Sequence, residues 1–181
     1  MLQITIPPGE FFNNETGEFV QIKGTTLQLE HSLISLSKWE AKWNKAYLTK
    51  NKKTTEETYD YIRCMTLTKN VDPNVYYGLT SKNIDDIVEY INAPMTATHF
   101  RDSKKSNPFG GDVITSELIY YWMVSFNIPF ECQKWHINRL ITLIRVCMIK
   151  NQPAKKMSRS EIMRQNAAIN AARRKRLNTK G

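Results

Sequence analysis

Apolar residues between positions 29 and 150 recur at helical spacing, and this periodicity constrains the fold of the 181-residue chain more than any other feature. The first such segment carries one apolar stripe, with Glu40 at its edge: Leu29, Leu33, Leu36, Trp39 and Trp43. The last carries two adjacent rows that make a broad apolar face: His136, Leu140, Leu143 and Cys147, then Ile137, Ile141, Ile144 and Met148. Since such stripes are stable only when buried against other elements, the pattern predicts a multi-helix domain.

Start and stop signals divide the region between these segments. Thr54 or Thr55 can cap a helix, with two glutamates in its first turn. Asp72-Pro73 begins a short helical turn that ends at Gly78. The next helix is predicted by four residues in phase: Ile84, Ile87, Val88 and Ile91. Residues 93–112 show no periodicity, and a polar loop of that length is expected to be mobile or functional.

Two helices follow the loop. Residues 114–128 are apolar almost all round, which predicts the most buried helix, and Pro129 ends it. Another helix is expected to start near Glu131 and to reach about residue 150. We expect these two helices to form the central antiparallel pair, joined by a tight turn over residues 127–131.

The first 27 residues predict strands. "LQITI" alternates in apolarity, while "EFF" and "EFVQI" flank "NNETG", which offers Asn and Gly for a tight turn. The alternation at Leu27, Gln28 and Leu29 can extend the last strand, so the start of the first helix stays open by several residues. The predicted fold is therefore mainly α. It has a small N-terminal β-hairpin element (1–27), a helical core domain (28–152) and a basic C-terminal helical tail (153–181).

Charge is concentrated at the C-terminal end. The chain has 26 Lys+Arg and 17 Asp+Glu, a net charge of +9, but residues 1–152 carry only +1 of it. Ser158 or Ser160 can cap a tail helix, whose candidate partner-binding residues are Arg159, Arg164, Arg173, Arg174, Lys175 and Arg176. A solvated terminus, a partner-binding segment and a nucleic-acid contact all remain open for this tail, the last being the least favoured because the body is nearly neutral.

Neither catalysis nor a bound metal or cofactor is predicted. The phosphate-loop, dinucleotide and zinc-protease motifs are absent from the sequence. Cys132 and His136 lie four apart and could meet on a helix as a metal pair, but no third ligand follows at a suitable spacing. We interpret the stretch from Cys132 to Cys147 as a packing helix, with His136 in a hydrogen-bonded niche. No apolar run approaches the roughly 20 residues that a bilayer requires, and no signal peptide is recognised, so we expect a cytoplasmic protein with no membrane partner.

Four stretches resemble a known family: "LQLEHSLISLSKWEAKW", "KTTEETYDYIRCMTL", "VITSELIYYWMVSFNIPFECQKWHINRLITLIRVC" and "KKMSRSEIMRQNAAINAARRKRLNTKG". Together they cover about 150 residues, from Leu27 to the end. They resemble the tail assembly chaperones of long-tailed, siphovirus-type bacteriophages. The resemblance rests on runs of residues rather than on a catalytic motif.

This resemblance implies a non-enzymatic helper in the cytoplasm of the infected host bacterium. Such chaperones bind the helical tape-measure protein during tail morphogenesis and are generally absent from the mature virion. Tail-tube protein and further copies of the chain are the other implied partners. The alternative is a structural virion component, a connector or tail-completion protein whose basic tail contacts DNA or a neighbouring subunit.

Overall fold

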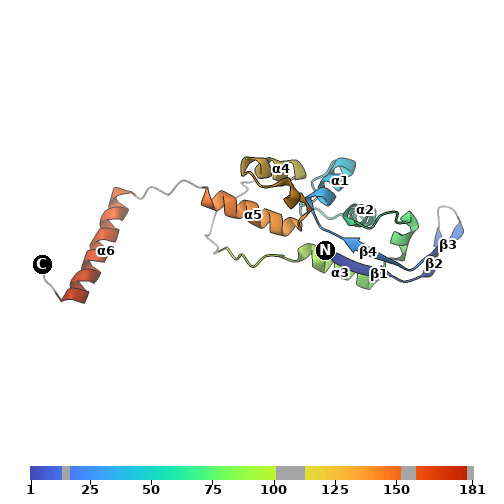
Figure 1. Cartoon of the computed structure of the whole chain (residues 1–181), viewed down its shortest axis with the longest axis horizontal. Coiled ribbons are helices and arrows are strands. Elements are labelled where there is room, and N and C mark those ends of the chain that lie inside the picture. Colours follow the sequence, from blue (N-terminus) through green and yellow to red (C-terminus); the bar gives the residue numbers. More distant parts are fainter. Residues whose placement is uncertain (14–16, 101–112, 152–157, 179–181) are drawn as a thin grey trace. The chain divides into compact units, whose positions relative to one another are not determined.

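The computed structural model describes residues 1–13, 17–100, 113–151 and 158–178 (Figure 1). The chain forms two compact units, Met1–Ile149 and Lys150–Gly181. The fold is mainly helical, as the sequence predicts. Most of the predicted loop at 93–112 lies outside the described residues, and residues 93–100 contain neither helix nor strand.

The N-terminal strands form a two-stranded antiparallel ribbon in two parts. Strand β1 (Leu2–Ile6) pairs with β4 (Thr25–Leu29), and β2 (Gly9–Asn13) pairs with β3 (Glu18–Ile22). Both parts share one register. Ile6 lies opposite Thr25, and three residues further along the first strand and three back along the second, Gly9 lies opposite Ile22. The interruption falls at Pro7-Pro8, where the ring nitrogens have no hydrogen to donate. The predicted hairpin is confirmed, and Gly17 has the positive φ of 70° that its turn requires.

The first helix begins later than its apolar stripe suggested. Leu29 belongs to β4, opposite Leu2, and α1 spans Leu33–Trp43 with Ser32 as its N-cap. Two alternatives were open for Leu29, the start of the helix or an extension of the strand, and the structure shows the strand, since pairing with β1 fixes this residue. The strand also runs past residue 27, across the expected limit of the β element.

Of the next three helices, the first two begin at the predicted caps. Helix α2 (Thr55–Met65) has a capping box between Thr54 and Glu57. The 3₁₀ helix η1 (Pro73–Gly78) starts after Asp72, whose side chain accepts from the Asn74 N–H. Helix α3 (Ser81–Asn92) has Thr80 as its cap. Its predicted inner face needs one correction, because Val88 is exposed and Tyr90 is buried in its place.

The last two core helices differ from the prediction in start and burial. Helix α4 spans Ser116–Ser125, but Tyr121 and Val124 on it are 64% and 61% exposed, so it is not the most buried helix. A 3₁₀ helix, η2 (Phe130–Lys134), follows Pro129, and α5 (Ile137–Lys150) starts only after His136. The predicted helix start near Glu131 was wrong because His136 is held in a β-bridge to Ser32.

Helix α1, not an α4–α5 pair, is central to the first unit. It lies against α2, α4 and η2. The Glu40 carboxylate joins it to α4: Oε1 accepts from the Tyr47 N–H at 2.8 Å and Oε2 from the Ser116 N–H at 2.7 Å. This carboxylate supplies a partner for a free N–H group at the start of α4, which is a reason for α4 to pack on α1.

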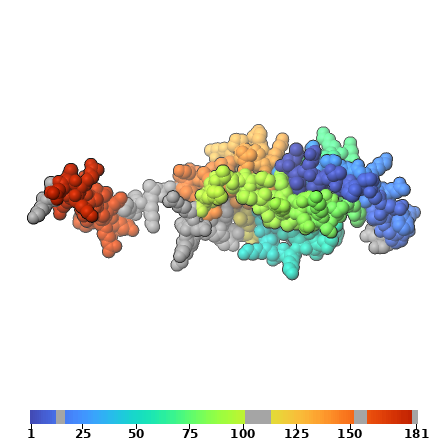
Figure 2. All heavy atoms as spheres, turned by 90° about the horizontal axis from the view of Figure 1, so that it is seen from below, coloured from blue at the N-terminus to red at the C-terminus, as the bar shows by residue number. Residues whose placement is uncertain are grey.

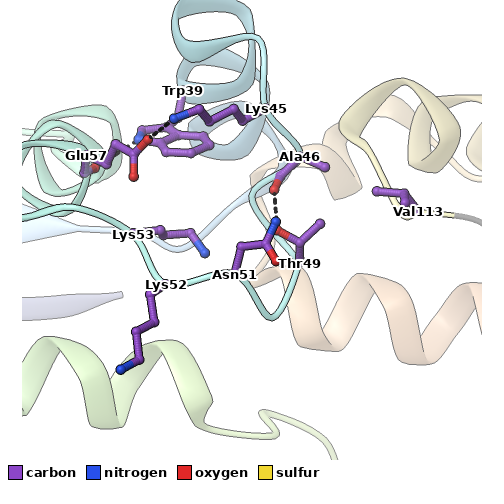
Figure 3. Close-up of a pocket in the computed structure, with 9 residues that line it drawn as sticks. All are labelled: Trp39, Lys45, Ala46, Thr49, Asn51, Lys52, Lys53, Glu57 and Val113. Carbon is purple, nitrogen blue, oxygen red and sulfur yellow. Dashed lines mark hydrogen bonds and ion pairs between the residues drawn. The ribbon is translucent and has the colours of Figure 1, made fainter.

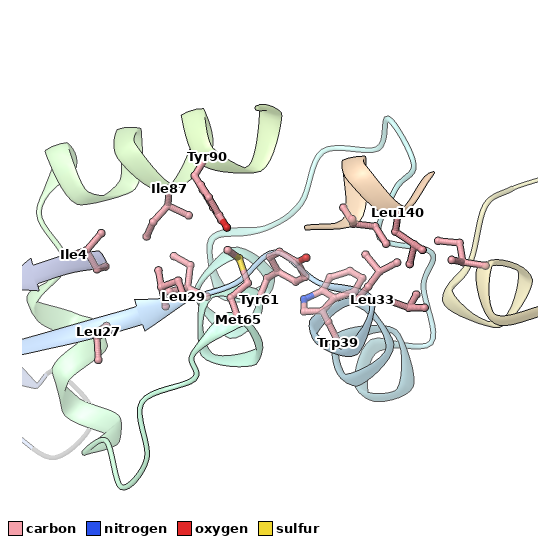
Figure 4. Close-up of a cluster of buried hydrophobic side chains, with 14 of the residues drawn as sticks. Ile4, Leu27, Leu29, Leu33, Trp39, Tyr61, Met65, Ile87, Tyr90 and Leu140 are labelled. Carbon is pink, nitrogen blue, oxygen red and sulfur yellow. The ribbon is translucent and has the colours of Figure 1, made fainter. Parts of the chain in front are cut away.

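One hydrophobic core joins the ribbon to the helices (Figure 4). It contains Ile4, Leu27 and Leu29 from the ribbon, Leu33 and Trp39 from α1, Tyr61 and Met65 from α2, Ile87 and Tyr90 from α3, and Leu140 from α5. The ribbon is therefore part of the first unit, with β1 lying alongside α3 (Figure 2). Across the described residues, no helix combines the length and apolarity needed to cross a membrane.

Candidate partner-binding surfaces

The second unit contains a single described helix, α6 (Arg159–Leu177). Ser158 and Glu161 form a capping box at its start, and Asn178 ends it in the left-handed conformation with φ 51°. The helix is described over its whole length, and none of its 19 residues is buried. Local capping therefore defines this helix.

All six predicted partner-binding residues lie on α6 and are exposed: Arg159, Arg164, Arg173, Arg174, Lys175 and Arg176. Within the described part of the chain, none of them forms an ion pair. Four are consecutive, Arg173 to Arg176, and the last three of them lie in the last turn of the helix, where cations interact favourably with the helix dipole. The helix also exposes Ile162, Met163, Ile169 and Leu177. The residues thus form a free surface that mixes positive charge with apolar side chains.

Cys132 and His136 do not lie on one helix. Cys132 belongs to η2, His136 precedes α5, and Cys147 lies near the end of α5. The His136 imidazole is buried: Nε2 donates to the Tyr90 carbonyl at 3.0 Å, and Nδ1 accepts from the Asn138 N–H at 3.3 Å. The predicted hydrogen-bonded niche is confirmed, although His136 lies ahead of the helix rather than within it.

A second buried histidine, His31, lies beside His136, a pairing that no local pattern in the sequence indicates. The two ring centroids are 5.0 Å apart, and His31 Nδ1 shares a hydrogen bond with the Tyr61 hydroxyl. Burial, together with the neighbouring His136, lowers the pKa of His31 to about 3. Burial also lowers the pKa of His136. Because both rings favour the neutral state, the pair is built for packing and hydrogen bonding rather than for carrying charge.

No group of three or more His, Cys, Asp or Glu residues capable of holding a metal occurs among the described residues. The three cysteines are free thiols there, with Cys132 buried and Cys64 and Cys147 partly so. Burial raises the pKa of the Cys132 and Cys64 thiols, which disfavours the reactive thiolate.

A surface cavity of about 470 Å³ lies where α1, the segment after it and α2 meet (Figure 3). Its lining residues are Trp39, Lys45, Ala46, Thr49, Asn51, Lys52, Lys53, Glu57 and Val113. Lys45 Nζ pairs with a Glu57 carboxylate oxygen at 2.5 Å. Lys53 Nζ lies 4.4 Å from the centre of the Tyr47 ring. The Lys52 amine points away from these groups in Figure 3. Lys45 and Glu57 are therefore paired with each other, and Lys53 lies over an aromatic ring.

The β2–β3 hairpin carries an exposed aromatic pair that the sequence analysis did not single out. Phe12 and Phe19 lie opposite each other in the register, with ring centroids 5.1 Å apart, and are 49% and 69% exposed. On the other face Phe11 stacks on Tyr77 of η1 with centroids 4.9 Å apart. Phe11 and Phe12 are consecutive on β2, so strand alternation puts them on opposite faces without deciding which face is buried. Packing against η1 covers the face that carries Phe11.

Comparisons of the chain with protein-family models, with curated proteins and with solved structures give no match.

Proposed function

We propose that this protein is a phage tail assembly chaperone, a non-enzymatic binding protein that holds the tape-measure protein during tail morphogenesis in the host cytoplasm and does not remain in the mature virion. The proposal starts from the family resemblance of the sequence. It takes as its binding element the helix α6, with the residues Arg159, Arg164, Arg173, Arg174, Lys175 and Arg176.

The observation that carries the proposal is the complete exposure of α6. A single helix is only marginally stable in water, and most helices in proteins gain their stability from a packed face. At a rise of about 1.5 Å per residue, α6 presents roughly 28 Å of helix without such a face. A partner helix of similar length would bury Ile162, Ile169 and Leu177, which are 45%, 43% and 65% exposed.

The charge of α6 specifies the chemistry of that partner. Helix α6 contains six basic residues and one acidic residue, Glu161. A matching partner helix has carboxylates beside its apolar stripe. Amphipathic helical segments of a tape-measure protein with this pattern are therefore the expected ligands, and opposite charge speeds their encounter with α6.

The test is to titrate overlapping helical fragments of the phage's tape-measure protein against the full chain and against a chain truncated after Gln152. We expect binding to the full chain and at least about tenfold weaker binding after truncation, the loss that accompanies removal of one or two strong contacts. Failure of every fragment to bind the full chain would contradict the proposal.

A matched pair of charge variants separates α6 from charge in general. Arg173→Glu/Arg176→Glu should weaken fragment binding. Lys69→Glu/Lys82→Glu changes the net charge equally at exposed positions of the first unit and should leave binding unchanged. An equal loss in both variants would mean that overall charge, not α6, attracts the fragment.

The run of four basic residues, 173–176, also supports the second candidate, a virion component whose tail contacts DNA. Phosphate binding by four charges gives a slope of log affinity against log salt of about −3.6 on duplex DNA. Tight DNA binding with that slope, lost on truncation, together with the protein's presence in purified particles, would favour this candidate over the chaperone.

A further inference from the structure

We propose that α6 of one copy docks on the outer face of the β2–β3 hairpin of a second copy, so that the chains associate head to tail. This contact goes beyond the tape-measure proposal and does not depend on it. It joins two surfaces that each copy carries uncovered within its described residues.

The first surface is the outer face of the hairpin. Because side chains alternate along a strand, Glu10 and Phe12 of β2 lie on the same face as Phe19 and Gln21 of β3. The opposite face packs inward, with Phe11 against Tyr77 and Ile22 buried. The outer face therefore presents a cross-strand aromatic pair with a glutamate beside it. Exposed aromatic pairs of this kind are typical centres of protein interfaces.

The second surface is one side of α6. Ile162, Ile169, Arg173 and Arg176 follow each other at steps of seven, four and three residues, so they fall on one side of the helix. This stripe is apolar in its first half and basic in its second. Every residue of it is exposed.

The two surfaces match in spacing. Along α6, Ile169 and Arg173 are separated by about 6 Å of helix rise. Along β2, Phe12 and Glu10 are separated by about 7 Å of strand. An α6 laid along the hairpin can therefore place Ile169 on the phenylalanine pair while Arg173 reaches the Glu10 carboxylate.

The two surfaces also match in charge. On the outer face of the hairpin the charged residue is Glu10, and the residues across from it and beside it, Gln21, Phe12 and Phe19, are uncharged. Helix α6 has six basic residues and one acidic residue. Because Glu10 is negative and α6 is basic, a second copy's α6 fits the hairpin face better than an acidic or neutral helix does.

A contact between two different surfaces of the same chain is heterologous, so each copy keeps one free half after pairing. That property gives a test by complementation. The hairpin variant is Phe12→Thr/Phe19→Thr, which removes the aromatic pair and keeps residues that suit a strand. The tail variant is Arg173→Glu/Arg176→Glu.

We expect the wild-type chain to associate as concentration rises, measured by sedimentation or light scattering. Each variant alone should associate at least about tenfold more weakly. An equal mixture of the two should form a heterodimer and nothing larger, because only one intact contact is available. Tyr121→Thr removes an exposed aromatic residue on α4 and should associate like the wild type.

Three outcomes would overturn the proposal. The wild-type chain could stay monomeric at all concentrations, or the mixture of the two variants could form no heterodimer. The third is a loss of association in Tyr121→Thr as large as that in the hairpin and tail variants. Far-ultraviolet circular dichroism confirms that the variants are folded. If the hairpin variant is not, Glu10→Lys replaces it, and its loss of association should be restored by mixing with the tail variant, whose glutamates then face the new lysine.

Fragment binding keeps this result separate from the proposed chaperone activity. The hairpin variant retains α6, so it should bind tape-measure fragments while failing to self-associate. A chain that self-associates as described but binds no fragment would leave the contact in place and contradict the chaperone proposal alone.

Discussion

At the scale of single residues, the buried histidines His31 and His136 should control how stability responds to mild acid. The folded protein keeps the His31 ring neutral because burial lowers its pKa to about 3. An unfolded chain takes up a proton on histidine near pH 6.5. Between about pH 3 and pH 6.5 the unfolded state therefore binds more protons than the folded state. The stability that the neutral ring contributes is present above about pH 6.5 and is lost as the pH falls below it.

We predict that the free energy of unfolding decreases by about 2 kcal/mol between pH 7 and pH 5 for each histidine that stays neutral when folded. Carboxylates titrate mainly below this window. Urea unfolding at several pH values measures the slope. His31→Gln should reduce it, because the variant no longer has this imidazole to protonate on unfolding.

The matched control is His99→Gln, which removes an exposed imidazole. A pH dependence in the His31 variant as steep as in the wild type would show that His31 is protonated while folded, contrary to its buried contact with Tyr61.

At the scale of elements, the ribbon and η1 are held together at Gly78. A Cβ atom there would lie 2.8 Å from Ile22 Cδ1 and 2.9 Å from Ile6 Cγ2, both on buried side chains. Gly78 has no positive φ, so the restriction comes from this close packing and not from the backbone. The close approach explains how η1 can cover the inner face of β3.

We predict that Gly78→Ala lowers the free energy of unfolding by about 1–3 kcal/mol, the usual effect of overpacking. Gly9→Ala in β2 is the control, because a Cβ there meets nothing within 4 Å. Denaturant unfolding of both variants decides the matter. Equal stability in the two would mean that Ile22 and Ile6 move aside without cost, and that η1 packs less closely than described.

At the scale of the whole molecule, the two units should be independent in stability. The core cluster draws its buried residues from Ile4 to Ile144, and α6 buries none. Removing α6 therefore takes away no part of the core.

Truncation after Gln152 should change the free energy of unfolding by less than about 0.5 kcal/mol, as is usual for changes at exposed positions. Calorimetry or denaturant unfolding on dilute samples, where copies do not associate, gives the comparison. A loss of several kcal/mol would mean that α6 packs on the first unit and would remove the basis for treating it as a free binding helix.

The sequence by itself determined the features that depend on near neighbours. Thr54, Asp72 and Thr80 start helices because each caps backbone N–H groups two or three residues away. The hairpin at "NNETG" and the exposure of the basic α6 residues also follow from local sequence, the latter because a run of like charges favours solvent.

Only the tertiary structure decided the features that depend on distant partners. Leu29 is a strand residue because it lies opposite Leu2, and α5 begins at Ile137 because His136 bridges to Ser32. The face of the hairpin that carries Phe12 is exposed because Tyr77 takes Phe11 instead. Periodicity assigns a side chain to a face, but long-range contacts determine which face is covered, so the aromatic half of the proposed contact could not be read from the sequence.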